Sequence, residues 1–235
     1  GRDIIGLSVV AINPNDGDVT SILAGRDIGP GAIYPSVFTV YGPGSLLVEA
    51  GRNLTLSSGV LAAGGQGIIT VGNGSDGGST YYPYLPAKSA DVTTLFGVGP
   101  GVDYASAIGQ YIDPANAGTN GINFLADIAG ILGQSPHQAW TTFQGLSTTR
   151  QQLLVQRAFL DFLTQVATDY RNPSSLYFGQ YGRAYTAIDT LFPASLGYTA
   201  NSTGGANGAA STVSTGKLTM PFALIETQQQ GDINI

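Results

Sequence analysis

The first part of the chain alternates short apolar runs with glycine-containing turns. Thr55 has a leucine on each side, and apolar residues at every second position predict a half-buried β-strand. Three Gly-Pro-Gly triplets, at 29–31, 42–44 and 99–101, predict corners or loop ends, because proline fixes φ and the next glycine tolerates a positive φ. The pattern therefore predicts short strands joined by tight turns.

Four segments share one phrase, in which a turn glycine and a polar residue precede apolar residues at every second position. The phrase begins at Gly1, Gly25, Gly51 and Gly231. The steps from Gly1 to Gly25 and from Gly25 to Gly51 are 24 and 26 residues, about the length of one coil of a parallel β-solenoid. Because one coil cannot bury its own apolar face, we expect successive coils to stack in register. We assign residues 1–118 to such β-helix coils.

The apolar spacing lengthens between residues 119 and 196 and predicts an α-helical insertion, a side domain of three helices. Ser135 and Pro136 predict the N-cap and first residue of a short helix. A longer helix is expected from about Thr148, and residues 181–192 predict a third helix that the following proline ends. The long helix carries an apolar stripe at Val155, Phe159, Phe162, Val166 and Tyr170.

The remainder of the chain returns to the strand pattern after a low-complexity segment. Residues 197–216 are almost wholly Gly, Ser, Thr, Ala and Asn, and such a segment cannot bury enough apolar surface to offset the entropy of ordering. We therefore expect a flexible loop there and a return to the β-helix at 217–235. Pro221 lies within the return strand and cannot donate a ladder hydrogen bond, so we expect that strand at an edge or a bend.

Composition and charge exclude several classes of protein. Only 10% of the residues are charged, against roughly 25% in an ordinary soluble domain, so glycine turns and polar ladders must replace ion pairs. A net charge of -6 with nine basic residues predicts neither nucleic acid nor an anionic membrane as a partner. The absence of cysteine excludes disulfides, thiol catalysis and thiolate metal sites.

The chain starts on a corner and stops within a strand pattern, which predicts a piece of a longer protein.

Catalytic and metal chemistry have weak candidates, and we expect no cofactor. The single histidine, His137, follows Pro136 in the first turn of a predicted helix and has no cysteine to pair with. Two further sets of residues could form a polysaccharide-cleaving site or a cation site. Both sets lie at corners or turns, where short polar side chains bond to nearby backbone. These residues are Asp3, Asp27, Asp91 and Asp232 for the acids, and Asn13, Asn15, Asp16, Asp18 and the glycine-rich stretch 72–78 for the cation.

Exposed aromatic side chains are the best candidates for ligand binding. They could stack on sugar rings or anchor a protein partner. The alternative is that these rings attach the helices to the β-helix, and it is favoured because the helical part must bury its apolar stripe against a neighbouring surface. The candidate binding residues are Tyr81, Tyr82, Tyr84, Tyr177 and Tyr181.

Several of these segments resemble a known family. Residues 25–28, 44–54 and 231–235 resemble rungs of the filamentous haemagglutinin family, large exoproteins secreted by the two-partner route in Gram-negative bacteria. The helical phrases at 159–163 and 181–193, with Asp169-Tyr170-Arg171-Asn172 between them, are similar to a segment of a domain of unknown function near the C-terminal end of such exoproteins. The resemblance implies a right-handed parallel β-helix, a secreted location at the bacterial cell surface, and adhesion. It implies no functional residues.

We therefore expect a mainly β protein with an α-helical insertion, acting as a structural and adhesive segment of a secreted surface exoprotein and not as an enzyme. The expected partners are a glycan or protein receptor on a host cell or other surface, and the rest of the same exoprotein through β-helix stacking. We expect no membrane insertion. Two alternatives stay open: a carbohydrate-active enzyme on a β-helix scaffold, and a folding or secretion cap of the shaft.

Overall fold

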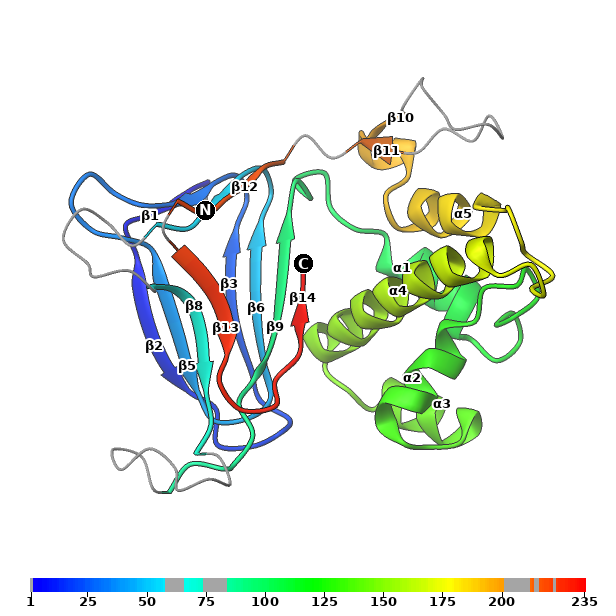
Figure 1. The fold of residues 1–235 in the computed structure, drawn as a ribbon, viewed down its shortest axis with the longest axis horizontal. Coiled ribbons are helices and arrows are strands. Elements are labelled where there is room, and N and C mark those ends of the chain that lie inside the picture. The colour runs from blue at the N-terminus through cyan, green and yellow to red at the C-terminus, as the bar shows by residue number, and fades with distance from the viewer. Residues whose placement is uncertain (1, 58–65, 74–83, 201–211, 214–215, 222) are drawn as a thin grey trace. The chain divides into compact units, whose positions relative to one another are not determined.

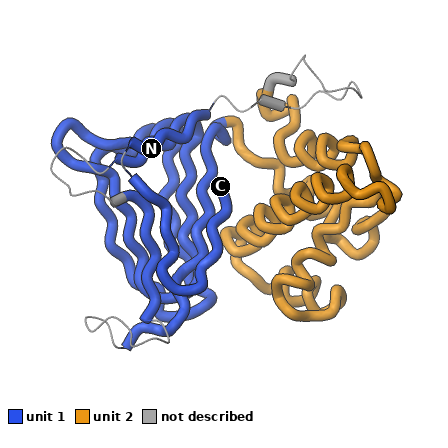
Figure 2. The backbone as a smooth tube through the Cα atoms, viewed as in Figure 1, with its two compact units in different colours: residues 1–99, 214–235 blue, residues 100–213 orange. Residues whose placement is uncertain are grey.

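A computed structural model describes residues 2–57, 66–73, 84–200, 212–213, 216–221 and 223–235. The chain divides into two compact units (Figure 2). We call Gly1–Gly99 with Ser214–Ile235 the strand unit, and Pro100–Val213 the helical unit.

The strand unit contains three parallel sheets of four strands each among its described residues (Figure 1). Sheet A is ordered β1 (Ile4–Ile5), β4 (Ile28–Gly29), β7 (Leu54–Thr55), β12 (Leu218–Thr219). Sheet B is ordered β2 (Ser8–Ile12), β5 (Val37–Tyr41), β8 (Gln66–Val71), β13 (Ala223–Thr227). Sheet C is ordered β3 (Val19–Ala24), β6 (Ser45–Ala50), β9 (Asp91–Phe96), β14 (Ile233–Asn234). The chain thus makes four passes, and each pass adds one strand to sheets A, B and C in turn.

The first three copies of the repeated phrase pair as their spacing predicted. Ile4 pairs with Ile28, and Ile28 pairs with Leu54, all in parallel. Paired residues of neighbouring parallel strands share a face, so alternation directs every second row of side chains inward, and the resulting interior contains fully buried residues from all three sheets. They include Phe38, Val40, Leu46, Val48, Leu54, Ile68 and Val92.

The prediction for the fourth copy is wrong. Ile233 of the Gly231 phrase pairs with Val92 in sheet C, whereas the position next to Leu54 in sheet A is taken by Leu218. The physical reason is that the returning chain re-enters at sheet A, so the Gly231 phrase arrives two strands later. Its true counterpart is the Ala90-Asp91 corner, whose Asp91 Oδ1 accepts a hydrogen bond from the Asp232 N–H at 3.0 Å.

The return strand is divided at Pro221, as its missing N–H predicted. The turn there separates β12 from β13, and both strands lie at the edge of their sheets. Most of the expected flexible loop, at 201–211 and 214–215, lies outside the described residues. Within the described part of the expected loop, β10 (Thr199–Ala200) and β11 (Thr212–Val213) form an antiparallel pair where no secondary structure was predicted.

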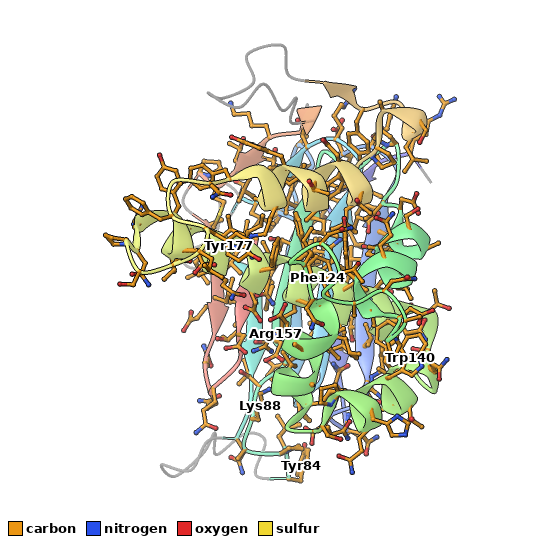
Figure 3. All side chains as sticks on the ribbon, turned by 90° about the vertical axis from the view of Figure 1, so that its right-hand side faces the viewer. Tyr84, Lys88, Phe124, Trp140, Arg157 and Tyr177 are labelled. Atoms are coloured by element: carbon orange, nitrogen blue, oxygen red, sulfur yellow. The ribbon has the colours of Figure 1, made fainter. Side chains whose placement is uncertain are left out.

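The helical unit has five α-helices in its described part: α1 (Tyr104–Ala107), α2 (Phe124–Leu132), α3 (Pro136–Gln144), α4 (Thr148–Arg171) and α5 (Gly182–Leu191). A π-helical turn (Ile108–Ile112) follows α1, and a 3-10 turn (Ala194–Leu196) follows α5. Phe124 is fully buried at the centre of the unit (Figure 3). Its ring centroid lies 5.1 Å from that of Tyr111 and 5.7 Å from that of Phe162.

The three helices expected from the sequence are confirmed as α3, α4 and α5. Ser135 caps α3 in a capping box with Gln138, and the stripe on α4 is buried from Val155 to Val166, although Tyr170 at its end is exposed. The count of three is wrong, because α1 and α2 also form, and helical structure begins at Tyr104, ahead of residue 119. Short helices are marginal on propensity alone. Asp103 caps α1 and Asn123 caps α2, and both helices bury residues in the shared core.

Candidate functional site

The outer face of sheet B is the most distinctive surface of the strand unit. Alternation buries Phe38, Val40 and Ile68 in the core and turns their neighbours outward. The register places the outward residues in two rows that cross the strands. One row contains Val10, Thr39, Ile69 and Glu226, and the other contains Ile12, Tyr41 and Val71. Val10 is 73% exposed and Ile12 is 57% exposed.

A cavity of about 480 Å³ lies on both rows, where they cross β5 and β8. Its described lining comes from two strands, β5 and β8, from the residue after β8, and from the turn after β13: Thr39, Tyr41, Ile69, Val71, Gly72, Gln228 and Gln229. Two of the hydrogen bonds that hold this turn in place join it to β8 and to the residue after β8. The Gly72 N–H donates to Gln229 Oε1 at 2.8 Å, and the Gln228 N–H donates to the Thr70 carbonyl at 2.9 Å. The cavity wall is therefore built by residues more than 150 positions apart in sequence.

The chemistry of this lining suits binding more than catalysis. It combines aliphatic side chains, an aromatic ring, a hydroxyl and two amides, which can contact apolar surface and exchange hydrogen bonds. The described lining residues include no carboxylate or imidazole that could act as a general acid or base near neutral pH.

Two predicted site residues, Tyr177 and Tyr181, are half-buried and make contacts within the helical unit. The Tyr177 ring (Figure 3) lies 3.4 Å from the Arg183 guanidinium carbon, and Tyr181 stacks on Tyr170 with centroids 4.1 Å apart. Arg183 also donates to Asp169 Oδ2 at 2.8 Å. These contacts lie within the helical unit and do not test attachment of the helices to the strand unit, so that alternative and a binding role for the pair both stay predictions.

The segment between Tyr170 and Tyr181 leaves apolar side chains in solvent. Leu176 is 90% exposed and Phe178 is 52% exposed. We call Leu176 and Phe178 the helical tip. Exposed large apolar residues on a turn can contact a partner, and the sequence pattern did not single out Leu176, because nothing in its spacing distinguishes it from a packed leucine.

The third predicted site residue in the described chain is Tyr84, in the strand unit (Figure 3), which is 76% exposed. Tyr81 and Tyr82 lie outside the described residues. The structure therefore brings together Tyr177 with Arg183, and Tyr181 with Tyr170, and leaves Tyr84 on the surface of the other unit.

The corner aspartates connect successive passes. Asp3 Oδ1 accepts hydrogen bonds from Arg26 Nε at 3.0 Å and from the Asp27 N–H at 3.2 Å. Asp27 repeats this one pass later with Arg52 Nε at 2.9 Å and the Asn53 N–H at 3.1 Å. The guanidinium partners lower the pKa of both carboxyls. We call this arrangement the aspartate ladder.

The ladder corrects one detail of the sequence prediction. Each carboxylate was expected to bond to the backbone of its own turn, and it bonds to the corner of the next pass. The corner interpretation itself is supported, because Asp3, Asp27 and Asp91 all accept a backbone N–H from the following pass.

Three of the candidate cation ligands at 13–18, namely Asn13, Asn15 and Asp18, make hydrogen bonds, and the bond between Asn15 and Asp18 is local to the turn, as predicted. The Asn15 N–H donates to Asp18 Oδ2 at 2.8 Å, and Asn13 Oδ1 accepts from Thr20 Oγ1 at 2.8 Å. Most of the glycine-rich stretch 72–78 lies outside the described residues. Within the part of the chain that the structure describes, no three His, Asp or Glu side chains gather as a metal site would require. His137 sits in the first turn of α3, and its carbonyl accepts from Thr141 Oγ1.

Asp127 is a titratable group that the sequence analysis did not single out. It lies in the first turn of α2, where burial and the nearby Asp161 carboxylate raise its pKa to about 6. Burial also raises the pKa of Glu49 on β6. The spacing of residues within one helix gave no signal, because the environment of Asp127 depends on a second helix.

Comparisons with protein-family models, with curated proteins and with solved structures found no match. The resemblance to the filamentous haemagglutinin family therefore stays a prediction. None of the helices in the described residues is both long and apolar enough to cross a membrane.

Proposed function

We propose that the protein is a non-catalytic structural and adhesive segment of a large secreted exoprotein at the bacterial cell surface. In this proposal the three sheets form the faces of a right-handed parallel β-helix. Four passes that return to the same sheets in parallel support it, and right-handed crossovers are strongly preferred between parallel strands.

The aspartate ladder is the observation that carries the structural part of the proposal. Each corner carboxylate binds an arginine and a backbone N–H one pass further along. When the corner side chains of each pass find their hydrogen-bond partners in the next pass, the fold can be extended by repeating passes, as a rod requires. The buried interior of the first three passes, against which the partly buried Leu218 and Ile225 of the fourth pass also pack, would give the rod its stiffness.

In this proposal the two expected partners bind at separate places on the molecule. A further β-helix coil of the same exoprotein would stack on the strand unit at β1, β2 and β3, each of which has a neighbour on one side only among the described strands. Arg2 occupies there the same corner position as Arg26 and Arg52, so it offers a guanidinium to an incoming aspartate. A surface receptor would meet the exposed side chains of the helical tip or the face of sheet B.

The proposal excludes a chemical step, and this separates it from a carbohydrate-active enzyme. Such an enzyme needs two carboxylates that face one substrate, and the carboxylates of Asp3, Asp27 and Asp91 instead bind cationic side chains and backbone N–H groups. Incubation with a panel of polysaccharides should release no reducing or unsaturated ends. Release of such ends above a heat-denatured control would contradict the non-catalytic assignment.

A surface-binding assay tests the adhesive part. The purified protein, labelled at its amino groups, should be retained on host epithelial cells in a saturable manner. The variant Leu176→Ser/Phe178→Ser removes the apolar helical tip, while Leu196→Ser changes a less exposed leucine in the same unit as a control. Failure of the intact protein to bind any of several cell types would remove the adhesive role and leave only the structural one.

A further inference from the structure

We propose that the cavity on sheet B binds one neutral sugar residue of a surface glycan. Tyr41 would contact the apolar face of the sugar ring, and Thr39, Gln228 and Gln229 would hydrogen-bond its hydroxyls. This inference rests on the proposed adhesive function and identifies where on the chain the glycan is recognised.

The apolar half of the site is formed by side chains that strand register places side by side. Tyr41 pairs with Ile12 on one side and with Val71 on the other, so its side chain stands in a row of three outward residues about 4.8 Å apart. Ile69 lies beside this row on the same strand as Val71. A pyranose presents C–H groups on one face and hydroxyls around its edge, and this row supplies apolar and aromatic surface for the former.

The polar half of the site lies on the turn that follows β13. Because Gln229 Oε1 accepts from the Gly72 N–H at 2.8 Å, the amide is oriented and its Nε2 keeps donors for a ligand. Gln228 is exposed beside it, and its amide offers both a donor and an acceptor. Together with the Thr39 hydroxyl, these two amides provide hydrogen-bond donors and acceptors for the hydroxyls of one sugar ring.

The charge and size of the site narrow the ligand further. The described lining contains no ionised side chain, whereas Glu226 stands in the same row as Ile69. A carboxylate in that row disfavours uronic and sialic acids over uncharged hexoses and N-acetylhexosamines. The volume of about 480 Å³ falls in the range of small-molecule sites.

Saturation-transfer NMR with the full chain tests the site. The probes are the methyl glycosides of glucose, galactose, mannose and N-acetylglucosamine, with glucuronic acid as the anionic probe, all at millimolar concentration. We expect transfer to at least one neutral probe and weaker transfer to glucuronic acid. Tyr41→Ala should weaken binding about tenfold, the effect of losing one stacking contact, whereas Tyr41→Phe should retain it.

Two further variants separate a lost site from a lost fold. Tyr34→Ala removes a tyrosine that is 68% exposed and outside the lining, and it should bind like the unmodified protein. Gln228→Ala changes an exposed side chain and should weaken binding several-fold without changing the circular dichroism spectrum. If Tyr41→Ala loses the spectrum of the folded protein, the Gln228→Ala result decides.

Three results would overturn the proposal. They are no transfer to any neutral probe, equal binding by Gln228→Ala and the unmodified protein, and stronger transfer to glucuronic acid than to every neutral probe. Cell retention distinguishes this failure from failure of the proposed function. If the protein adheres to cells and Tyr41→Ala adheres equally well, adhesion stands and the sheet B site is wrong.

Discussion

Substitution of Gly51 by alanine gives the sharpest test of the stacked corners. A Cβ built at Gly51 would lie 2.2 Å from the Gly25 carbonyl oxygen and 3.0 Å from the Gly99 Cα. Both neighbours are backbone atoms of other passes, so no flexible side chain can move aside. The chain must separate at a point where two ladder hydrogen bonds meet, because the Gly51 N–H donates to the Ala24 carbonyl at 2.9 Å and the Gly51 carbonyl accepts from the Gly99 N–H at 2.7 Å.

The cost can be estimated from these contacts. Overpacking a close-packed site typically costs 1–3 kcal/mol, and each weakened hydrogen bond adds roughly 0.5–1.5 kcal/mol, so Gly51→Ala should lower the free energy of unfolding of the strand unit by about 2–6 kcal/mol. Gly29→Ala is the matched control. Its Cβ would meet Thr55 Cβ at 3.7 Å and Ile5 Cδ1 at 3.9 Å, which are ordinary contacts, so its stability should change by less than about 1 kcal/mol.

The assay must read the strand unit separately. The single tryptophan, Trp140, belongs to the helical unit, so its fluorescence reports that unit. Hydrogen exchange in urea, followed by mass spectrometry on peptides that cover β6 and β9, reports the strand unit. Gly51→Ala should accelerate exchange in those peptides and leave the Trp140 transition unchanged. If the peptides of β6 and β9 exchange at the same rate in the Gly51→Ala and Gly29→Ala variants, the close approach of the Gly25 and Gly51 corners is refuted.

Three further predictions concern charge and capping. Asp27 has a lowered pKa in the folded state, mainly through its hydrogen bond from Arg52, so its contribution to the stability of the strand unit is present above pH 4 and is lost as the pH falls. Asp27→Asn should therefore flatten the acid dependence of hydrogen exchange in the strand unit. An unchanged dependence would contradict the aspartate ladder. Asp127 has a raised pKa of about 6, so its ionisation destabilises the helical unit as the pH rises from about 4 to 6. Asp127→Asn should therefore stabilise the helical unit by about 1–2 kcal/mol at pH 8, after allowance for solvent screening. Equal urea midpoints by Trp140 fluorescence at pH 8 would argue against that burial. Ser135→Ala removes the capping box of α3 and should cost about 1 kcal/mol in the same assay, whereas Ser135→Asp should recover most of it.

The local signals in the sequence were sufficient for individual elements. Ser135 and Pro136 identified the start of α3, and the stripe at Val155, Phe159 and Phe162 identified the buried side of α4, because capping and the 3.6-residue period act within one segment. The same holds for the division of the return strand at Pro221. These features depend on residues a few positions apart, so they can be recognised before any tertiary contact is known.

The arrangement of the strands depended on the whole fold. Alternation tells which side chains share a face of a strand, but it does not identify the neighbouring strand, since parallel pairs are joined across long connections. The Gly231 phrase looked like the Gly51 phrase, and only stacking of Leu218 on Leu54 moved it to sheet C. The sheet B cavity depends in the same way on Gly72 and Gln229, which are 157 residues apart. The sequence by itself thus determined the strand repeats and the three strongest helices, while the tertiary structure decided which passes touch, and so where a ligand could be held.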